Sequence, residues 1–248
     1  MNFKKKPILG MLHLYGGNYA MDRFDDELEI FEQEGLDGYI IENYGGGMQE
    51  VRGALQMIEE FDKYSEMNKG INILPNNFEV AYALAAAYDL DFIQLDYISG
   101  SYIGNRGEVI SIDSYHYNRF RDKFPEIKIL GGVWPKYYEP VEGSVLSDDI
   151  ETAKERCDAI VVTGAGTGKE TPIDKIKEFK KLAGHNFPVI IGAGLNELNV
   201  EEQLSFADGG IIGSYIKERG IANNKVERSR VRDFVSKVNK HRVETCCV

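Results

Sequence analysis

The sequence predicts an α/β protein built as a single (β/α)8 barrel, or TIM barrel, on three grounds. Its 248 residues match the roughly 250 that are typical of such a barrel. Short apolar runs alternate with amphipathic stretches eight times along the chain, as buried parallel strands alternate with helices in this fold. Two late runs end in glycines, at 189–194 and 209–214, where the turns after strands seven and eight of a TIM barrel often hold a phosphate.

These segments give each expected element its place in the chain. Strands are expected at 7–13, 37–43, 71–75, 91–97, 127–134, 158–163, 188–192 and 209–213. Helices are expected at 21–34, 48–66, 78–88, 112–123, 145–156, 173–183, 198–206 and 225–239. We therefore expect one domain over residues 1–248, with the barrel at about 7–240 and a C-terminal tail at 241–248. A doubly wound sheet fits less well, because it carries a Gly-rich fingerprint after its first strand and residues 14–18 read Leu-Tyr-Gly-Gly-Asn.

Composition and charge limit the classes of partner. The formal net charge of −11 argues against a nucleic-acid-binding surface, which needs clusters of Lys and Arg. No apolar stretch approaches the roughly 20 residues of a membrane-spanning helix. Three cysteines, an odd number, argue against a disulfide framework. We therefore expect a cytoplasmic protein that binds neither nucleic acid nor membrane and whose outer helices could support a homo-oligomer.

Polar residues at the carboxyl ends of the strands are the candidates for catalysis, because TIM-barrel active sites lie there. Alternation puts Gln94 and Asp96 on one face of the fourth strand, which aims Asp96 at the barrel mouth as a candidate general base. Glu42 ends the second strand as a candidate acid, base or metal ligand, with Asn43 holding the loop. Lys136 follows the fifth strand as a candidate electrophile or anion clamp. The structural alternatives are an Asp96 that pairs with Lys or accepts loop amides, a Glu42 that anchors a neighbouring strand, and a solvated Lys136 that pairs with Asp96 or Glu42.

Four further residues are candidates for contacts with a substrate. His13 ends the first strand, where it could shuttle protons or serve as a hydrogen-bonded packing residue. Asn72 and Asn76 share a face of the third strand and could bond sugar hydroxyls, while Asn77 could cap the next helix. Thr163 opens a Gly-rich loop after the sixth strand.

Phosphate is expected on backbone N–H groups in the last two βα turns, because glycine lets the backbone approach an anion closely. The residues expected there are Gly192, Gly194, Gly213 and Ser214. The loop at 163–171 could add the amides of Gly164 and Gly166 or close over the ligand. This loop is not a Walker A motif, because Thr and Glu occupy positions that require Gly and Ser or Thr. No His or Cys spacing indicates zinc. The sequence does not determine whether the protein needs a metal, and Mg²⁺ is the one cofactor considered.

Five segments together resemble the BtpA/SgcQ family. They are residues 7–14 (PILGMLHL), 38–45 (GYIIENYG), 70–77 (GINILPNN), 160–168 (IVVTGAGTG) and 210–217 (GIIGSYIK). The resemblance covers about residues 7–235 and implies a ribulose-phosphate-binding type of TIM barrel. It identifies no catalytic residue, since one member is known for photosystem I biogenesis and others look like enzymes of sugar operons. The chain departs from the family at Gly131–Gly132, Pro75 and Asp96, where members tend to have Ala-Asp, Arg and Asn.

These observations favour an enzyme that acts on a small phosphorylated sugar or sugar-like metabolite by isomerase or lyase chemistry. A noncatalytic assembly or biogenesis factor on the same scaffold is the first alternative, and a Mg²⁺-dependent phosphohydrolase is the second. An enzyme should have a deep mouth where at least two of Asp96, Glu42 and Lys136 converge. A factor should have a filled mouth and an exposed apolar patch elsewhere.

Overall fold

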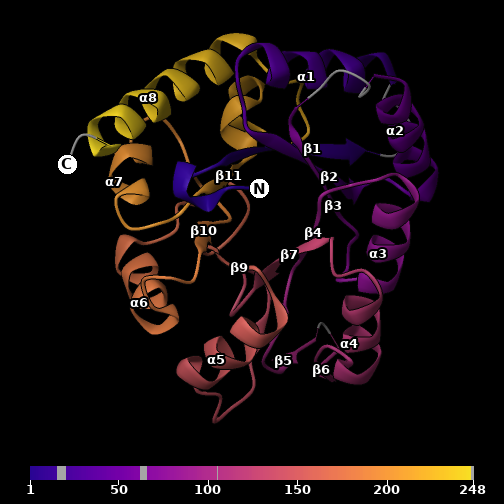
Figure 1. Ribbon diagram of the computed structural model, residues 1–248, viewed down its shortest axis with the longest axis vertical. Helices are drawn as coiled ribbons and strands as arrows, with labels where there is room; N and C mark the ends of the chain where they lie inside the picture. The colour runs from indigo at the N-terminus through magenta and orange to yellow at the C-terminus, as the bar shows by residue number, and fades with distance from the viewer. Residues whose placement is uncertain (16–20, 62–65, 105, 247–248) are drawn as a thin grey trace.

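Eight parallel strands close into a barrel, which confirms the predicted TIM-barrel fold (Figure 1). The structure is a computed structural model that describes residues 1–15, 21–61, 66–104 and 106–246. Around the barrel the strand order is β1, β11, β10, β9, β7, β4, β3 and β2. The bounds are β1 (Ile8–Tyr15), β2 (Gly38–Gly45), β3 (Asn68–Asn72), β4 (Phe92–Leu95), β7 (Lys128–Gly132), β9 (Ala159–Val162), β10 (Val189–Ile191) and β11 (Gly210–Ile212).

Helices form the outer layer around these strands (Figure 1). They are α1 (Met21–Gln33), α2 (Met48–Phe61), α3 (Phe78–Ala87), α4 (Ser114–Lys123), α5 (Leu146–Arg156), α6 (Ile173–Ala183), α7 (Val200–Leu204) and α8 (Arg228–Cys246). Short 3-10 turns lie at Phe3–Lys5, Ser214–Ile216 and Glu218–Gly220. Among the described residues, no helix is both long and apolar enough to cross a membrane.

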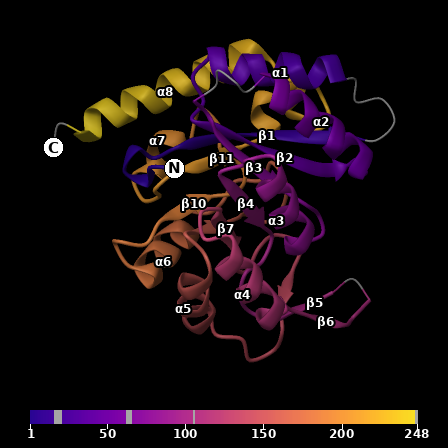
Figure 2. The same ribbon diagram turned by 45° about the vertical axis from the view of Figure 1, so that its right-hand side comes forward.

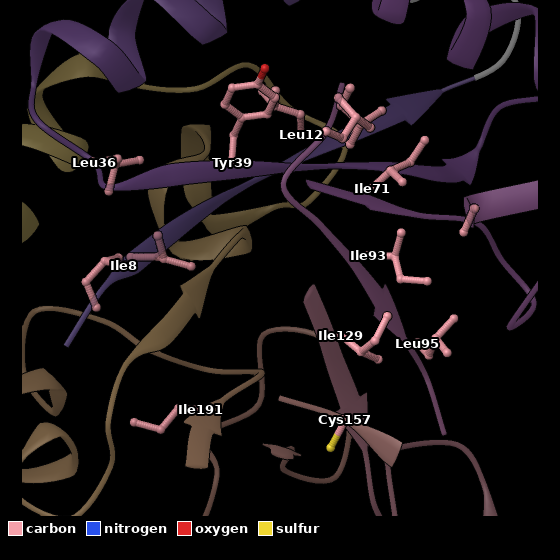
Figure 3. Close-up of a cluster of buried hydrophobic side chains, with 14 of the residues drawn as sticks. Ile8, Leu12, Leu36, Tyr39, Ile71, Ile93, Leu95, Ile129, Cys157 and Ile191 are labelled. Atoms are coloured by element: carbon pink, nitrogen blue, oxygen red, sulfur yellow. The ribbon is translucent and has the colours of Figure 1, made fainter. Parts of the chain in front are cut away.

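Alternation along the strands sorts the apolar side chains into two clusters. One cluster fills the inside of the barrel and contains Leu9, Met11, Ile40, Phe92, Leu130, Ala159, Val161, Ile190 and Ile211. The other lies between strands and helices, where Figure 3 shows Ile8, Leu12, Tyr39, Ile71, Ile93, Ile129 and Ile191. Because successive residues of a strand point to opposite faces, the same alternation brings the residues after the inner cluster into the barrel mouth.

Several elements end at positions that differ from the expected ones. The third strand ends at Asn72 instead of 75, because the Leu74 N–H donates to Asn43 Oδ1 at 2.7 Å and Pro75 has no N–H for a ladder bond. Helix α8 runs to Cys246, so residues 241–246 continue the last helix where a tail was expected. The expected helix at 48–66 is described as far as Phe61; residues 62–65 and 247–248 lie outside the described chain.

A small antiparallel sheet, which the sequence did not predict, stands beside the barrel mouth. Its strands are β5 (Tyr102–Ile103), β6 (Val109–Ile110) and β8 (Glu139–Pro140), in the order β6-β5-β8. The hairpin β5–β6 follows β4, whereas β8 follows β7. Figure 2 shows this hairpin projecting away from the barrel. The sheet therefore ties together two loops that leave neighbouring barrel strands.

Candidate functional site

One cavity of about 760 Å³ occupies the barrel mouth at the carboxyl ends of the strands. This volume lies within the range of about 300–1,000 Å³ that ligand sites occupy. Nine of the predicted site residues line it: His13, Glu42, Asp96, Lys136, Thr163, Gly192, Gly194, Gly213 and Ser214. The tertiary structure thus brings together side chains and turns from seven different βα units around one volume.

Two carboxylates and one amide form the centre of the site. Glu42 is buried in the second half of β2, and its Oε1 accepts a hydrogen bond from Asn72 Nδ2 at 3.1 Å. The same Nδ2 lies 3.4 Å from Asp96 Oδ1, and the Tyr138 hydroxyl donates to Asp96 Oδ2 at 3.1 Å. Asn72 itself does not border the cavity; it bridges the two carboxylates from beneath. Glu42 and Asp96 therefore share one donor, which keeps their charges close together.

Burial and this proximity change the proton affinities of the carboxylates. Burial, followed by the nearby charge of Asp96, raises the pKa of Glu42 to about 7. Burial also raises the pKa of Asp96, although bonds from Asn72 and Tyr138 oppose the shift. Glu42 is thus set to exchange a proton near neutral pH, which is the property that acid–base catalysis requires.

His13 lies beside Glu42 without bonding to it. Its Nε2 is 3.8 Å from Glu42 Oε2, beyond hydrogen-bond distance. Burial, followed by the positive charges of Lys217 and Lys136, holds the pKa of His13 well below its usual range. The imidazole is therefore neutral at physiological pH and can offer one ring nitrogen to a ligand.

Lys136 faces the cavity from the loop after β7. Its Nζ donates to Thr167 Oγ1 at 3.2 Å, and its backbone N–H donates to Thr163 Oγ1 at 2.7 Å. Within the described chain, no carboxylate lies within 4.0 Å of this ammonium group, so the alternative of an ion pair with Asp96 or Glu42 is wrong. The positive charge is left at the cavity surface, where it can face an anionic group.

The glycine turns after β10 and β11 form the opposite part of the cavity. Across the described ranges of the chain, the N–H groups of Gly194, Gly213 and Ser214 donate to no protein acceptor. The N–H of Gly192, in contrast, donates to Val162 O at 2.7 Å. A Cβ at Gly192 would lie 2.4 Å from Val161 Cγ1. Gly192 therefore makes room between strands, while the other three turn residues keep amides that can face an anion.

Three predicted residues have contacts outside the cavity. Asn76 uses both ends of its amide on the backbone of Tyr97, donating to its carbonyl and accepting from its N–H, each at 3.1 Å. Gly164 and Gly166 do not border the cavity; a Cβ at Gly164 would lie 2.4 Å from Glu170 O. The end of this loop reaches the cavity instead, through Thr167 and Gly168. Asn77, as one alternative predicted, caps α3 by accepting from Val80 N–H.

Two residues beside the carboxylates were not assigned a role from the sequence. Gln94 borders the cavity, and its Oε1 is buried without a hydrogen-bond partner among the described residues, as is Asn72 Oδ1. Buried acceptors of this kind are uncommon, and Gln94 Oε1, at the cavity, can accept a bond from a ligand hydroxyl. The sequence could have indicated Gln94, because strand alternation puts it on the same face as Asp96. No sequence pattern indicates Tyr138, because its contact with Asp96 depends on the path of the loop after β7.

The described residues hold no group of three or more His, Cys, Asp or Glu side chains arranged for a metal ion. Glu42 and Asp96 form a pair of carboxylates, with Asn72 Nδ2 between them. A Mg²⁺ ion at this place would need oxygen ligands from a bound substrate as well.

A buried ion pair fixes the chain after β11 to α1. Lys217 Nζ lies 3.0 Å from Glu27 Oε2, and both side chains are almost fully buried. Glu27 Oε1 also accepts from the Val226 N–H at 2.9 Å and from Arg23 Nε at 3.0 Å. Gly220, in the segment between Lys217 and Val226, borders the cavity. These bonds therefore hold one edge of the barrel mouth in place.

Comparison with known proteins agrees with this architecture. The sequence matches the BtpA family over residues 4–240. The chain belongs to the BtpA family. An uncharacterised protein of Methanocaldococcus jannaschii is 33% identical to it, over 96% of this chain and 97% of that protein. The photosystem I biogenesis protein BtpA of Synechocystis is 26% identical, over 92% of this chain and 86% of that protein.

Solved structures share the fold at low sequence identity. A structure described as native KDPGal has a TM-score of 0.66 and 13% identity, with 95% of each chain covered. The N-(5'-phosphoribosyl)anthranilate isomerase of Pyrococcus furiosus has a TM-score of 0.59 and 14% identity, covering 94% of this chain and 99% of its own. These similarities confirm the TIM barrel of this BtpA-family protein.

Proposed function

We propose that this BtpA-family protein is an enzyme that isomerises or cleaves a small phosphorylated sugar or sugar-like metabolite by acid–base chemistry. One observation carries the proposal: buried Glu42 and partly buried Asp96 share a cavity with backbone N–H groups that donate to no acceptor among the described residues. Glu42 and Asp96 supply the proton-transfer groups, and Gly194, Gly213 and Ser214 supply the amides. The shared fold of an isomerase whose name denotes a phosphoribosyl substrate is consistent with this class.

The glycine turns hold the phosphate in this proposal. The amides of Gly194, Gly213 and Ser214 donate to its oxygens, and Gly192 keeps the space that lets the turn approach. Gly164 and Gly166 shape the loop whose end, at Thr167, borders the cavity. Binding through the phosphate places the sugar against the carboxylates, so remote binding energy orients the reacting carbons.

The carboxylates move the protons. Asp96 removes a proton next to the substrate carbonyl, and Glu42 in its protonated form returns a proton to the neighbouring atom. Lys136 stabilises the negative charge that develops on the substrate oxygen. The free acceptor of Gln94, which borders the cavity, bonds a sugar hydroxyl, and neutral His13 positions the group beside Glu42.

The BtpA relative named for photosystem I biogenesis favours one competing function, that of a noncatalytic assembly factor. Such a factor has no need of an open mouth with converging titratable groups. The cavity of about 760 Å³ and the proximity of Glu42 and Asp96 support the enzyme instead. A Mg²⁺-dependent phosphohydrolase remains a prediction that the same binding experiment tests.

The test is a thermal-shift screen with phosphate, ribose 5-phosphate, ribulose 5-phosphate and related phosphosugars, each with and without Mg²⁺. A ligand at 100 times its Kd adds about 2.7 kcal/mol to the free energy of unfolding. We expect selective stabilisation by a phosphosugar over free phosphate, followed by turnover of that sugar. No shift with any anion would contradict the phosphate site and favour the assembly factor. Stabilisation that requires Mg²⁺, with release of phosphate, would favour the hydrolase.

A further inference from the structure

The strand order gives the cavity two ends of different chemistry. Around the barrel, β10 lies four strands from β3, and β11 lies four strands from β4. In a ring of eight, four steps reach the opposite side. The glycine turns after β10 and β11 therefore face the loops after β3 and β4 across the mouth. A ligand whose phosphate sits on the glycine turns must extend toward those loops.

The side of the cavity opposite the phosphate turns carries a group of apolar and aromatic side chains. We call it the apolar wall and define it as Leu74, Pro75, Tyr97, Ile103, Ile110 and Tyr138. Ile103 and Ile110 come from the β5–β6 hairpin that projects beside the mouth (Figure 2). Ile103 is 38% exposed although it borders the cavity. An isoleucine left open inside a binding cavity gains free energy when an apolar group of the ligand covers it.

The tyrosines of the wall are held in fixed positions by one another. The ring centroids of Tyr97 and Tyr138 are 5.2 Å apart, and each contacts Tyr102, at 5.4 Å and 5.9 Å. Tyr102 is fully buried and donates to Ser99 O at 2.9 Å. Aromatic side chains anchored in this way present rigid surfaces for edge-to-face or stacked contacts with another ring.

Polar groups at the rim of the wall distinguish a ring from a plain hydrocarbon. Arg106 and Glu108, from the same hairpin, border the cavity beside Ile103 and Ile110. They add a donor and an acceptor at the edge of an otherwise apolar surface. Both residues are exposed, and Glu108 Oε2 already accepts from the Arg106 N–H at 2.9 Å. A heterocycle offers apolar faces for the wall and polar edges for the Arg106 guanidinium, whereas an acyl chain offers no polar edge.

We propose that the apolar wall is a second subsite, which binds a flat heterocyclic or aromatic ring attached to the phosphorylated sugar. The ligand class is then nucleotide-like: phosphate on the glycine turns, sugar at the carboxylates and ring against the hairpin. This inference rests on the proposed function and extends it. The volume of about 760 Å³ suits such a ligand, because sites of about 300–1,000 Å³ hold drug-sized molecules and a phosphopentose alone is smaller.

The experiment compares the affinities of ribose 5-phosphate, adenosine 5′-monophosphate and uridine 5′-monophosphate by isothermal titration calorimetry. We expect at least one nucleotide to bind about tenfold or more tightly than ribose 5-phosphate, because the ring buries apolar surface. Ile103→Ala should weaken that nucleotide about three- to tenfold and leave ribose 5-phosphate unchanged. Val109→Ala is the matched control, since Val109 lies on the same hairpin, is 65% exposed and does not border the cavity.

The outcomes separate the inference from the proposed function. Nucleotides that bind no more tightly than ribose 5-phosphate would overturn the ring subsite and leave the phosphosugar proposal standing. An equal loss for nucleotide and sugar phosphate in Ile103→Ala would also overturn it, because the residue would then act on the whole site. Failure of phosphate, ribose 5-phosphate and both nucleotides to bind would overturn the proposed function itself.

Discussion

Replacement of Glu42 by Gln should make the protein more stable at alkaline pH and abolish its activity. Glu42 is buried, and its pKa is raised from 4.5 to about 7, first by burial and then by the charge of Asp96. Gln keeps the shape and an oxygen that can accept from Asn72 Nδ2. It removes only the proton exchange and the buried charge. The substitution therefore tests whether ionisation of the buried Glu42 carboxylate lowers the free energy of unfolding.

The magnitude follows from the pKa difference. The folded state holds a proton that the unfolded state has already released, so the free energy of unfolding falls as pH rises from 4.5 to about 7. One pKa unit corresponds to about 1.4 kcal/mol, which gives about 3 kcal/mol over the whole window. About 1 kcal/mol of this loss of stability falls above pH 6. Measurements in that range avoid the sequence pI of about 5.0, where the net charge is near zero.

Urea unfolding of the wild type and Glu42→Gln at about pH 6 and pH 8.5 measures this difference. The stability of the variant relative to the wild type should increase by about 1 kcal/mol between the two pH values. Glu126→Gln, at an exposed position, is the control and should show no such change. A difference between Glu42→Gln and wild type that is independent of pH would refute a raised pKa at Glu42.

Three further substitutions test other parts of the site. Asp96→Asn should abolish turnover and spare phosphate binding, so unchanged turnover would contradict its role as base. Tyr138→Phe removes a donor that lowers the pKa of Asp96; the acidic limb of the pH–rate profile should move to higher pH, and an unmoved limb would exclude that role. Lys217→Met removes one of the two cations that lie 3.0 Å from the buried Glu27 carboxylate and leaves Arg23 on its other oxygen, so it should cost about 1.5–3 kcal/mol. Urea unfolding checks this value, and a loss below about 1 kcal/mol would show that the pair is not important for stability.

The sequence by itself determined the barrel. Eight apolar segments that alternate with amphipathic ones can bury both faces of a parallel sheet in few arrangements other than a barrel. The strand ends and the polar residues at them could therefore be predicted. Glu42, Asp96 and Lys136 were found because each follows an apolar strand and active sites of this fold lie there. The glycine turns were found by the same positional rule.

Tertiary structure decided how these residues act. The bridge from Asn72 to both carboxylates joins three strands, and the raised pKa of Glu42 depends on burial and on Asp96 beside it; neither has a local signal. Asn76, expected at the substrate, instead bonds the backbone of Tyr97. The hairpin beside the mouth also escaped prediction, because its strands are two residues long and one of them, β5, pairs with β8, a segment far along the chain. Long-range contacts of this kind depend on packing, whereas the periodicity that predicts strands and helices is local.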